Sequence, residues 1–194
     1  AQVNRAYFEH KQDTVPKIGF IMLDMDHFKQ VNDIHGHDAG DKVLVQLVKI
    51  IKDTCRQSDW VIRWGGEEFV VVVNIINLLE IQSLAERIRF NIEAYSFDIG
   101  NSKKLKKTCS IGISSYPFCG NRPEEFSWEQ TLNIADAALY AVKNNGRNGW
   151  INLFAKDGEN IEQLAFEEPG TIGTQIKEGY LFYETSLEKE VKWD

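Results

Sequence analysis

The stretch of residues 60–73 constrains the fold most, because two β-prone runs flank a pair of glycines. Residues 60–64 lead into Gly65 and Gly66, and residues 69–73 lead away from them. A two-residue hairpin turn of the primed types requires positive φ, which glycine adopts without steric cost. Residues 60–73 are therefore predicted to form a β-hairpin that turns at the glycine pair.

Two glutamates, Glu67 and Glu68, follow the glycine pair directly. Adjacent carboxylates repel each other unless a cation or solvent offsets their charge. The glycines also remove side-chain bulk, so a phosphate group can approach the backbone closely here. On this pattern alone, a solvated hairpin tip and a metal site remain equal alternatives.

A second acidic pair, Asp24 and Asp26, ends an apolar run that begins after Lys17. An apolar run without alternation predicts a strand buried on both faces, and ligands commonly bind at the carboxyl end of such a strand. If this strand lies beside the hairpin, Asp24 and Glu67 face each other across the sheet. Oxygen ligands from separate strands, completed by water and substrate phosphates, are the usual way to hold Mg²⁺. The two acidic pairs together predict a magnesium site.

Residues 65–69, Gly-Gly-Glu-Glu-Phe, resemble the signature of the GGDEF family of diguanylate cyclases in its GGEEF variant. Residues 24–41 are similar throughout to the family pattern D-x-D-x-F-K-x-x-N-D-x-x-G-H-x-x-G-D. Residues 135–149 resemble its A-D-x-A-L-Y-x-x-K-x-x-G-R-N segment. The three blocks stand in the family's order and spacing. The resemblance implies a GGDEF domain over residues 1–154, followed by an extension, residues 155–194, to which the sequence assigns no role.

The composition is that of one globular domain with an appendage, since the chain has 194 residues, of which 43% are hydrophobic and 26% charged. The net charge of −7 argues against a general nucleic-acid or anionic-membrane surface. Cys55, Cys109 and Cys119 lack a C-x-x-C spacing, which disfavours a disulfide framework or a zinc site and favours the cytoplasm. No apolar run is long enough to span a membrane and no signal peptide opens the chain, so no membrane contact is expected.

The remaining segments predict an alternation of helices and strands. Strands are expected at residues 108–116 and 150–154, and helices at residues 27–34, from Asp38 through Ile51, from Ile81 to Ile92, and from a capping box at Ser127 to Asn145. A short helix over residues 1–11 and a strand pair over residues 172–183 are also expected.

The predicted order of elements is β-α-α-β-β-α-β-α-β. It indicates an α+β sandwich with a mainly antiparallel sheet of about five strands, flanked by helices. The family resemblance implies a ferredoxin-like core, similar to that of nucleotidyl cyclases and polymerase palms.

The resemblance implies that the chain condenses two GTP molecules into cyclic di-GMP and releases two pyrophosphates. It implies a homodimer in which each subunit holds one GTP, with Mg²⁺ as cofactor and Mn²⁺ as a substitute. By position, Asp24, Glu67 and the backbone carbonyl of Met25 are the expected metal ligands. Glu68 either assists deprotonation of the attacking 3′-hydroxyl or shares a metal, and Asp26 is expected to be a structural acid. The start of the family's N-terminal motif is missing, so an upstream sensory or dimerising region is expected outside this chain.

Asn32 and Asp41 match the family's guanine-reading positions. A carboxylate accepts hydrogen bonds from guanine N1–H and the 2-amino group, a donor pair that adenine lacks. A site built on such bonds rejects the analogue without them, so GTP is expected over ATP. The positions that match phosphate contacts are the backbone at His27 and Phe28, Gly66 at the turn, and the side chains of Lys29, Lys143 and Arg147.

Arg56 and Asp59 resemble the family's R-x-x-D inhibitory site. Arginine stacks on purines and binds phosphate with two parallel hydrogen bonds, so Arg56 paired with Arg87 on the following helix suits a cyclic di-GMP dimer. Feedback inhibition by the product is therefore expected. Two alternatives to an active cyclase remain: a catalytically silent module that binds GTP or cyclic di-GMP, and a regulatory GGDEF domain joined to a phosphodiesterase domain.

Overall fold

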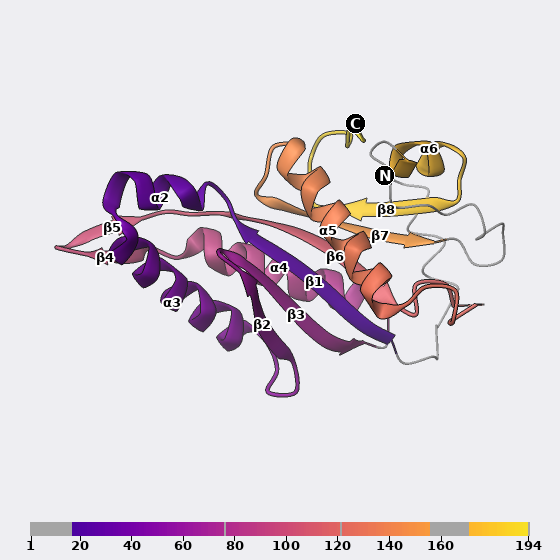
Figure 1. The fold of residues 1–194 in the computed structure, drawn as a ribbon, viewed down its shortest axis with the longest axis horizontal. Helices are drawn as coiled ribbons and strands as arrows, with labels where there is room; N and C mark the ends of the chain where they lie inside the picture. The colour runs from indigo at the N-terminus through magenta and orange to yellow at the C-terminus, as the bar shows by residue number, and fades with distance from the viewer. Residues whose placement is uncertain (1–16, 76, 121, 156–170, 194) are drawn as a thin grey trace.

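A six-stranded sheet in the order β2-β3-β1-β6-β7-β8 lies at the centre of the computed structural model, which describes residues 17–75, 77–120, 122–155 and 171–193 (Figure 1). All neighbouring strands run antiparallel except β6 and β7, which are parallel. The α+β class with a mainly antiparallel sheet is confirmed, and the sheet has one strand more than predicted. The strands are β1 (Lys17–Met25), β2 (Trp60–Gly65), β3 (Glu68–Ile75), β6 (Cys109–Tyr116), β7 (Gly149–Ala155) and β8 (Leu181–Thr185).

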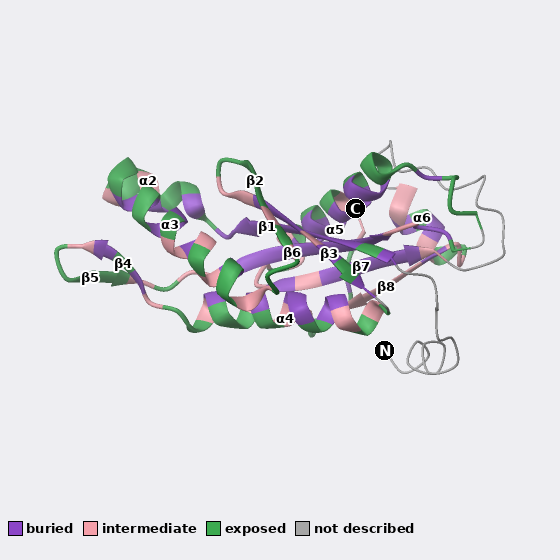
Figure 2. Ribbon diagram, turned by 90° about the horizontal axis from the view of Figure 1, so that it is seen from below, coloured by how far each residue is buried: buried purple, intermediate pink, exposed green. Residues whose placement is uncertain are grey.

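Two long helices cover opposite faces of this sheet. Figure 2 shows α4 below the sheet and α5 above it, and α3 packs against α4. Within the described ranges, no helix combines the length and apolar character needed to cross a membrane. The helices are α2 (Phe28–His35), α3 (His37–Thr54), α4 (Leu78–Ala94), α5 (Trp128–Asn144) and α6 (Thr171–Lys177).

The central strand β1 is buried on both faces, as its continuous apolar run predicted. Ile21 and Leu23 belong to the cluster that packs between the sheet and helices α3 and α4. Phe20 and Met22 lie in a second cluster, with Leu139 of α5. Successive strand residues point to opposite faces of a sheet, so both layers require β1 to be apolar throughout. The two acids that end this run, Asp24 and Asp26, therefore lie at one edge of the core.

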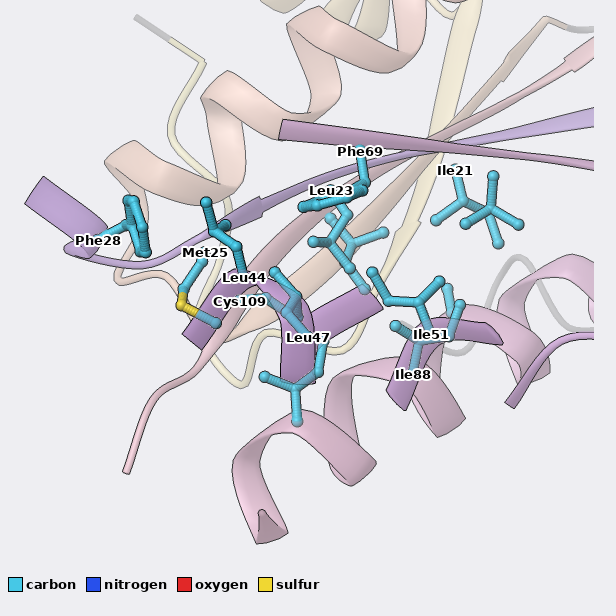
Figure 3. Packing of buried hydrophobic residues seen from close by; sticks show 14 of the residues in the cluster. Ile21, Leu23, Met25, Phe28, Leu44, Leu47, Ile51, Phe69, Ile88 and Cys109 are labelled. Carbon is cyan, nitrogen blue, oxygen red and sulfur yellow. The ribbon is translucent and has the colours of Figure 1, made fainter. Parts of the chain in front are cut away.

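The helical stripes read from the sequence form the cluster on the α4 side of the sheet. Figure 3 shows Leu44, Leu47 and Ile51 of α3 together with Ile88 of α4. Three of these side chains, those of Leu47, Ile51 and Ile88, are completely buried. Full burial of a Leu or Ile side chain contributes roughly 1.5–3 kcal/mol. This packing fixes α3, and with it the α2–α3 pair, against the sheet.

Helix α5 lies very close to β6 because Gly112 has no side chain. A Cβ atom at Gly112 would lie 1.9 Å from the Ala135 carbonyl oxygen and 2.3 Å from the Leu139 nitrogen. At its start, α5 has the predicted capping box, in which Ser127 and Gln130 satisfy each other's backbone N–H groups. The helix is therefore fixed in position along β6, which sets where its far end meets β1.

Two parts of the fold differ from the sequence prediction. A small hairpin of β4 (Phe97–Gly100) and β5 (Lys103–Leu105) was not predicted. Its turn uses Asn101 and Ser102 at positive φ, a conformation that a two-residue Asn-Ser sequence signals only weakly. The strand pair predicted over residues 172–183 is wrong, because α6 and β8 occupy that region.

Short apolar runs do not distinguish a buried helix from a strand by periodicity alone, which explains the error over residues 172–183. The break between α6 and β8 falls at Gly179, which has φ 81°. The helix predicted over residues 1–11 and most of the loop that follows it lie outside the described residues.

Candidate active site

The β2–β3 hairpin turns one residue later than predicted. Gly65 pairs with Glu68, so Gly66 and Glu67 form the turn, and Gly66 has φ 45°. The register shifts between Arg63 and Gly65, as it does where a bulge places an extra residue on one strand. The Arg63 guanidinium holds the turn by donating to the Gly66 carbonyl, from Nε at 2.9 Å and from Nη2 at 2.8 Å.

This shift changes which glutamate lies opposite Asp24. In the β1–β3 ladder Asp24 pairs with Glu68, so the predicted opposition of Asp24 and Glu67 is wrong by one residue. Directly opposed residues in a sheet have Cβ atoms about 4.5–5.5 Å apart. Glu67 and Glu68 both act electrostatically on Asp24. Three carboxylates are thus gathered at the end of β1 and the tip of the hairpin.

Asp24 is held in an environment that disfavours its charge. Asp24 is only 8% exposed, and this burial raises the pKa of its carboxyl group. The Lys143 ammonium group lowers that pKa, whereas the charges of Glu67 and Glu68 raise it. Lys143 Nζ lies 3.0 Å from Asp24 Oδ2. One ammonium group offsets one carboxylate, so the group of three acids keeps excess negative charge that a cation would neutralise.

The donors at this edge fit a hard divalent cation. Asp24 and Glu68 offer carboxylate oxygens from adjacent strands, and Met25 adds a backbone carbonyl at the end of β1. In the part of the chain that the structure describes, no three His, Cys, Asp or Glu side chains form a metal-binding group by themselves. Mg²⁺ commonly binds through one or two carboxylates, with water and substrate phosphates as the other ligands. The donor set therefore matches Mg²⁺ bound together with a nucleotide.

Asp26 has a structural role, in agreement with the sequence analysis. The residue is 2% exposed, and its Oδ2 accepts hydrogen bonds from Thr108 Oγ1 at 2.6 Å and from the Asn148 N–H at 3.1 Å. Its Oδ1 accepts from Ser110 Oγ at 2.7 Å. Both carboxylate oxygens are thus occupied, and they join the end of β1 to β6 and to the loop after α5.

The turn between β1 and α2 offers backbone rather than side chains. His27 has φ 56°, in the left-handed region, and precedes the first residue of α2. The Phe28 side chain is buried in the core, which leaves only its backbone for a ligand contact. Lys29 is exposed. Lys107 Nζ donates to the His27 carbonyl at 3.2 Å. Lys107 was missed because no local pattern relates it to a turn 80 residues earlier.

The two candidate base-reading residues lie on the adjacent helices α2 and α3. Asn32 is half-buried, and Asp41 is exposed on the first turns of α3. A Cβ atom at Gly40 would lie 1.9 Å from Asn32 Oδ1 and 3.2 Å from Phe28 Cζ. Gly40 therefore lets the Asn32 amide rest directly on α3, one residue before Asp41. The sequence analysis missed this function of Gly40, although the residue belongs to the motif.

The phosphate-binding candidates Lys143 and Arg147 lie at the end of α5 and in the loop that follows it. We call residues 145–149 the phosphate loop, after the phosphate contact predicted for Arg147. Gly146, Arg147 and Asn148 have φ values of 114°, 64° and 47°, so three consecutive residues adopt positive φ. The Arg147 N–H donates to the Val142 carbonyl at 3.0 Å. Non-glycine residues at positive φ are uncommon, so this backbone needs support from its surroundings.

The three residues of the candidate inhibitory site line one surface cavity of about 270 Å³. Asp59 Oδ2 accepts from the Arg56 N–H at 2.7 Å, and the Arg87 guanidinium donates to the Thr54 carbonyl at 3.0 Å. Glu80, which the sequence analysis missed, binds the Arg56 guanidinium at 2.6 Å. The structure thus brings Arg56, Asp59 and Arg87 together, with an acid already bound to one of them.

This cavity is separate from the carboxylate group. It includes Asn74 and Ile75 at the end of β3, whereas Glu68 begins that strand. Six residues of strand span roughly 20 Å, at about 3.4 Å per residue. The hairpin and β3 therefore connect the two sites through the sheet.

Comparison with known proteins identifies the family. The family described as "Diguanylate cyclase, GGDEF domain" matches residues 2–149. Diguanylate cyclase A of Treponema denticola is 43% identical over 131 residues, which are 68% of this chain and 34% of that protein. The chain spans about a third of the length of the curated relatives it matches.

Solved structures agree with this assignment. The GGDEF domain of DgcB from Caulobacter crescentus, in complex with c-di-GMP, has a TM-score of 0.62 and 29% identity, covering 76% of this chain and 83% of that one. The active GGEEF domain of a diguanylate cyclase from Vibrio cholerae has a TM-score of 0.60 and 30% identity, covering 75% and 90%. The chain belongs to the GGDEF family of diguanylate cyclases.

Proposed function

We propose that this chain is a diguanylate cyclase domain, which joins two GTP molecules into cyclic di-GMP and releases two pyrophosphates. The observation that carries the proposal is the pairing of Asp24 with Glu68 at the ends of two adjacent strands, with Lys143 bound to the same aspartate, in a chain of this family. The similar proteins from Treponema denticola and Vibrio cholerae are described as diguanylate cyclases.

The reaction consists of two identical bond-forming steps. In each, the 3′-hydroxyl oxygen of one GTP attacks the α-phosphorus of the other, the bond to the β-phosphate bridging oxygen breaks, and pyrophosphate leaves. Such a step depends on in-line placement of the hydroxyl group and on neutralisation of the phosphate charges. Each domain binds one GTP, so two subunits must face each other for both steps to occur.

The metal-binding group comprises Asp24, Glu68 and the Met25 carbonyl. Bound Mg²⁺, or Mn²⁺ in its place, supplies charge neutralisation on the triphosphate. The motif alone suggested Glu67 as the metal ligand and Glu68 as the residue that assists deprotonation. The register supports the opposite assignment, because Glu68 is the strand partner of Asp24. Glu67, half-exposed in the turn, is then the group that accepts the proton of the 3′-hydroxyl.

The remaining residues bind the two ends of GTP. Asp41 accepts from guanine N1–H and the 2-amino group, and Asn32 meets the remaining base edge. The side chains that bind the phosphates come from α2, α5 and the loop after α5, and the backbone at His27, Phe28 and Gly66 adds N–H groups. The side chains are those of Lys29, Lys143 and Arg147.

The cavity beside the end of β3 serves product inhibition. Arg56, Asp59 and Arg87 line it, and guanidinium groups suit both the phosphates and the guanine faces of cyclic di-GMP. The similar GGDEF domain of DgcB forms a complex with c-di-GMP, which supports a ligand of this kind for the cavity.

Chromatography of the products after incubation with GTP and Mg²⁺ tests the function. Wild type is expected to form cyclic di-GMP, and Asp24→Asn to form none. Glu67→Gln is expected to keep Mg²⁺-dependent GTP binding but lose turnover, whereas Glu68→Gln loses both. GTP binding without any cyclic di-GMP, even when two domains are joined by a fused coiled coil, would show a silent binding module. Absence of GTP binding would overturn the assignment of the site.

A further inference from the structure

Residues 185–193, which follow the family match, run along the phosphate loop. We call these residues the clamp segment. Its first residues bind Trp150, the second residue of β7: the Ser186 N–H donates to the Trp150 carbonyl at 3.2 Å, and the Trp150 N–H donates to Ser186 Oγ at 2.9 Å. Thr185 Oγ1 donates to the same carbonyl at 2.8 Å. The clamp segment thus begins with three hydrogen bonds directly after the phosphate loop.

The far end of the clamp segment binds the start of the phosphate loop. Asn145 Nδ2 donates to the Lys192 carbonyl at 2.9 Å, and the Lys192 N–H donates to Asn145 Oδ1 at 2.8 Å. The Asn145 amide therefore satisfies both backbone groups of Lys192, as a neighbouring strand would. Asn145 Nδ2 also donates to the Ala141 carbonyl at 2.8 Å, so the same side chain closes the end of α5.

Apolar packing fixes the clamp segment between these two ends. Val191 is 5% exposed and belongs to a cluster with Val142 of α5 and Ile151 of β7. A Cβ atom at Gly149 would lie 2.6 Å from Leu187 Cδ2, so Leu187 packs directly on the last residue of the phosphate loop. The segment is therefore part of the folded domain on this side of the sheet.

The opposite side of the phosphate loop is held by the domain core. Asn148 donates its backbone N–H to Asp26, and its Nδ2 donates to Glu93 Oε1 at 2.8 Å. Arg89 donates to Asn148 Oδ1 at 2.9 Å. Between the core and the clamp segment lies Arg147 at φ 64°. Unfavourable backbone conformations persist where the surrounding contacts determine them more than once, which is the situation here.

We propose that the clamp segment positions the phosphate loop for GTP, with Asn145 as the positioning residue that joins them. This inference rests on the proposed function of Arg147 as a phosphate contact. Asn145 does not touch the substrate. It fixes the backbone two residues before Arg147, and so the position from which the Arg147 side chain reaches the phosphates. A segment beyond the family match is thereby part of the nucleotide site, and a partner that displaced residues 185–193 would weaken GTP binding without contacting the active site.

Calorimetric titration with Mg²⁺ and a GTP analogue that carries a methylene bridge between the α- and β-phosphates tests the proposal. Asn145→Ala is expected to weaken binding roughly five- to tenfold, since it removes the two hydrogen bonds to Lys192. Asn144→Ala is the matched control, because Asn144 is exposed on the adjacent position of α5. It is expected to bind like wild type.

Substitutions at Lys192 test the same contact from the other side. Both bonds to Asn145 use the Lys192 backbone, so Lys192→Ala is expected to be silent. Lys192→Pro removes the donating N–H and is expected to weaken binding as Asn145→Ala does. Lys192→Ala and Lys192→Pro leave the sequence of α5 and the phosphate loop unchanged. An equal loss of affinity for the GTP analogue in both variants would assign the effect to the lysine charge and overturn the proposal.

A double-variant cycle separates positioning from general destabilisation. If Asn145 acts through Arg147, then Asn145→Ala combined with Arg147→Ala binds no more weakly than Arg147→Ala alone. Independent, additive losses would overturn the proposal, as would wild-type affinity of Asn145→Ala beside a weakened Arg147→Ala. Cyclic di-GMP binding to the Arg56 cavity is expected to be unchanged in Asn145→Ala. Absence of analogue binding by wild type would instead overturn the proposed function itself.

Discussion

Lys143 and Asp24 form an ion pair of 3.0 Å that joins the end of α5 to the end of β1. Both residues belong to the candidate site, where we propose Lys143 as a phosphate contact and Asp24 as a metal ligand. The ammonium group of Lys143 lies where it offsets the charge of the buried Asp24 carboxylate. Binding of Mg²⁺ and GTP would supply Asp24 with a metal and Lys143 with a phosphate, so each residue exchanges one charged partner for another.

Replacing Lys143 by alanine is expected to lower the melting temperature, because loss of one partner leaves the Asp24 charge buried and uncompensated. Mg²⁺ alone is then expected to raise the melting temperature of Lys143→Ala more than that of wild type, because the cation replaces the ammonium group. Thermal unfolding of each protein with and without roughly 10 mM Mg²⁺ measures this shift in melting temperature. Lys49→Ala, at an exposed position of α3, serves as control. Equal Mg²⁺ shifts in all three proteins would contradict the account.

Gly40→Ala is expected to displace the Asn32 amide, since the added Cβ would lie 1.9 Å from Asn32 Oδ1. The affinity for GTP should fall about as far as it does in Asn32→Ala, by roughly tenfold for one or two lost hydrogen bonds. Titration with GTP compares the two variants. A Gly40→Ala protein that binds GTP like wild type would show that Asn32 does not depend on this contact.

Asp41→Ser is expected to admit ATP. The serine hydroxyl group can donate as well as accept, so the penalty against adenine, which lacks the guanine donor pair, is relieved. Competition between GTP and ATP for the site measures the preference. Unchanged discrimination would show that Asp41 does not read the base.

Glu80→Gln is expected to tighten binding of cyclic di-GMP. Glu80 forms a 2.6 Å ion pair with Arg56, and this pair must loosen before the guanidinium can bind the ligand. A modestly lower dissociation constant is expected, because an exposed ion pair is weak and little free energy is needed to break it. Arg56→Ala and Arg87→Ala should abolish the binding. Weaker binding by Glu80→Gln would mean that Glu80 itself helps to hold the ligand.

Glu86 is expected to make the domain less stable in acid. The hydrogen bond from Arg89 lowers the pKa of the Glu86 carboxyl group below its ordinary value of 4.5. The corresponding stabilisation is fully present above pH 4.5 and is lost as the pH falls through the lower pKa of the folded state. Urea unfolding between about pH 3 and 7 should show that the free energy of unfolding falls less at acid pH in Glu86→Gln than in wild type. Glu124→Gln, at an exposed loop position, should keep the wild-type profile.

The sequence predicted those parts of the fold in which many neighbouring residues carry the same signal. The apolar run of β1 and the stripe of α3, with Leu44, Leu47 and Ile51, depend on burial repeated along a whole element. The candidate active-site residues lie within three motif blocks, so their elements could be placed before the structure was known. The confirmed capping box at Ser127 is likewise a local signal.

Features set by single long-range contacts could not be predicted. The bulge between Arg63 and Gly65 moved the turn by one residue, and no composition rule marks it. The bond from Lys107 to His27 spans 80 positions, and that between Asn145 and Lys192 spans 47. Each depends on how elements pack, which is decided by the whole fold rather than by neighbouring residues.

The order of the reaction in protein concentration tests the central claim most directly. The rate of cyclic di-GMP formation from GTP and Mg²⁺, followed by chromatography over a hundredfold range of roughly 0.1 to 10 μM protein, reports whether two domains must meet. The account predicts a rate that rises with the square of the protein concentration and is absent in Asp24→Asn. Failure to form cyclic di-GMP at any concentration, even with two domains joined by a fused coiled coil, would contradict it.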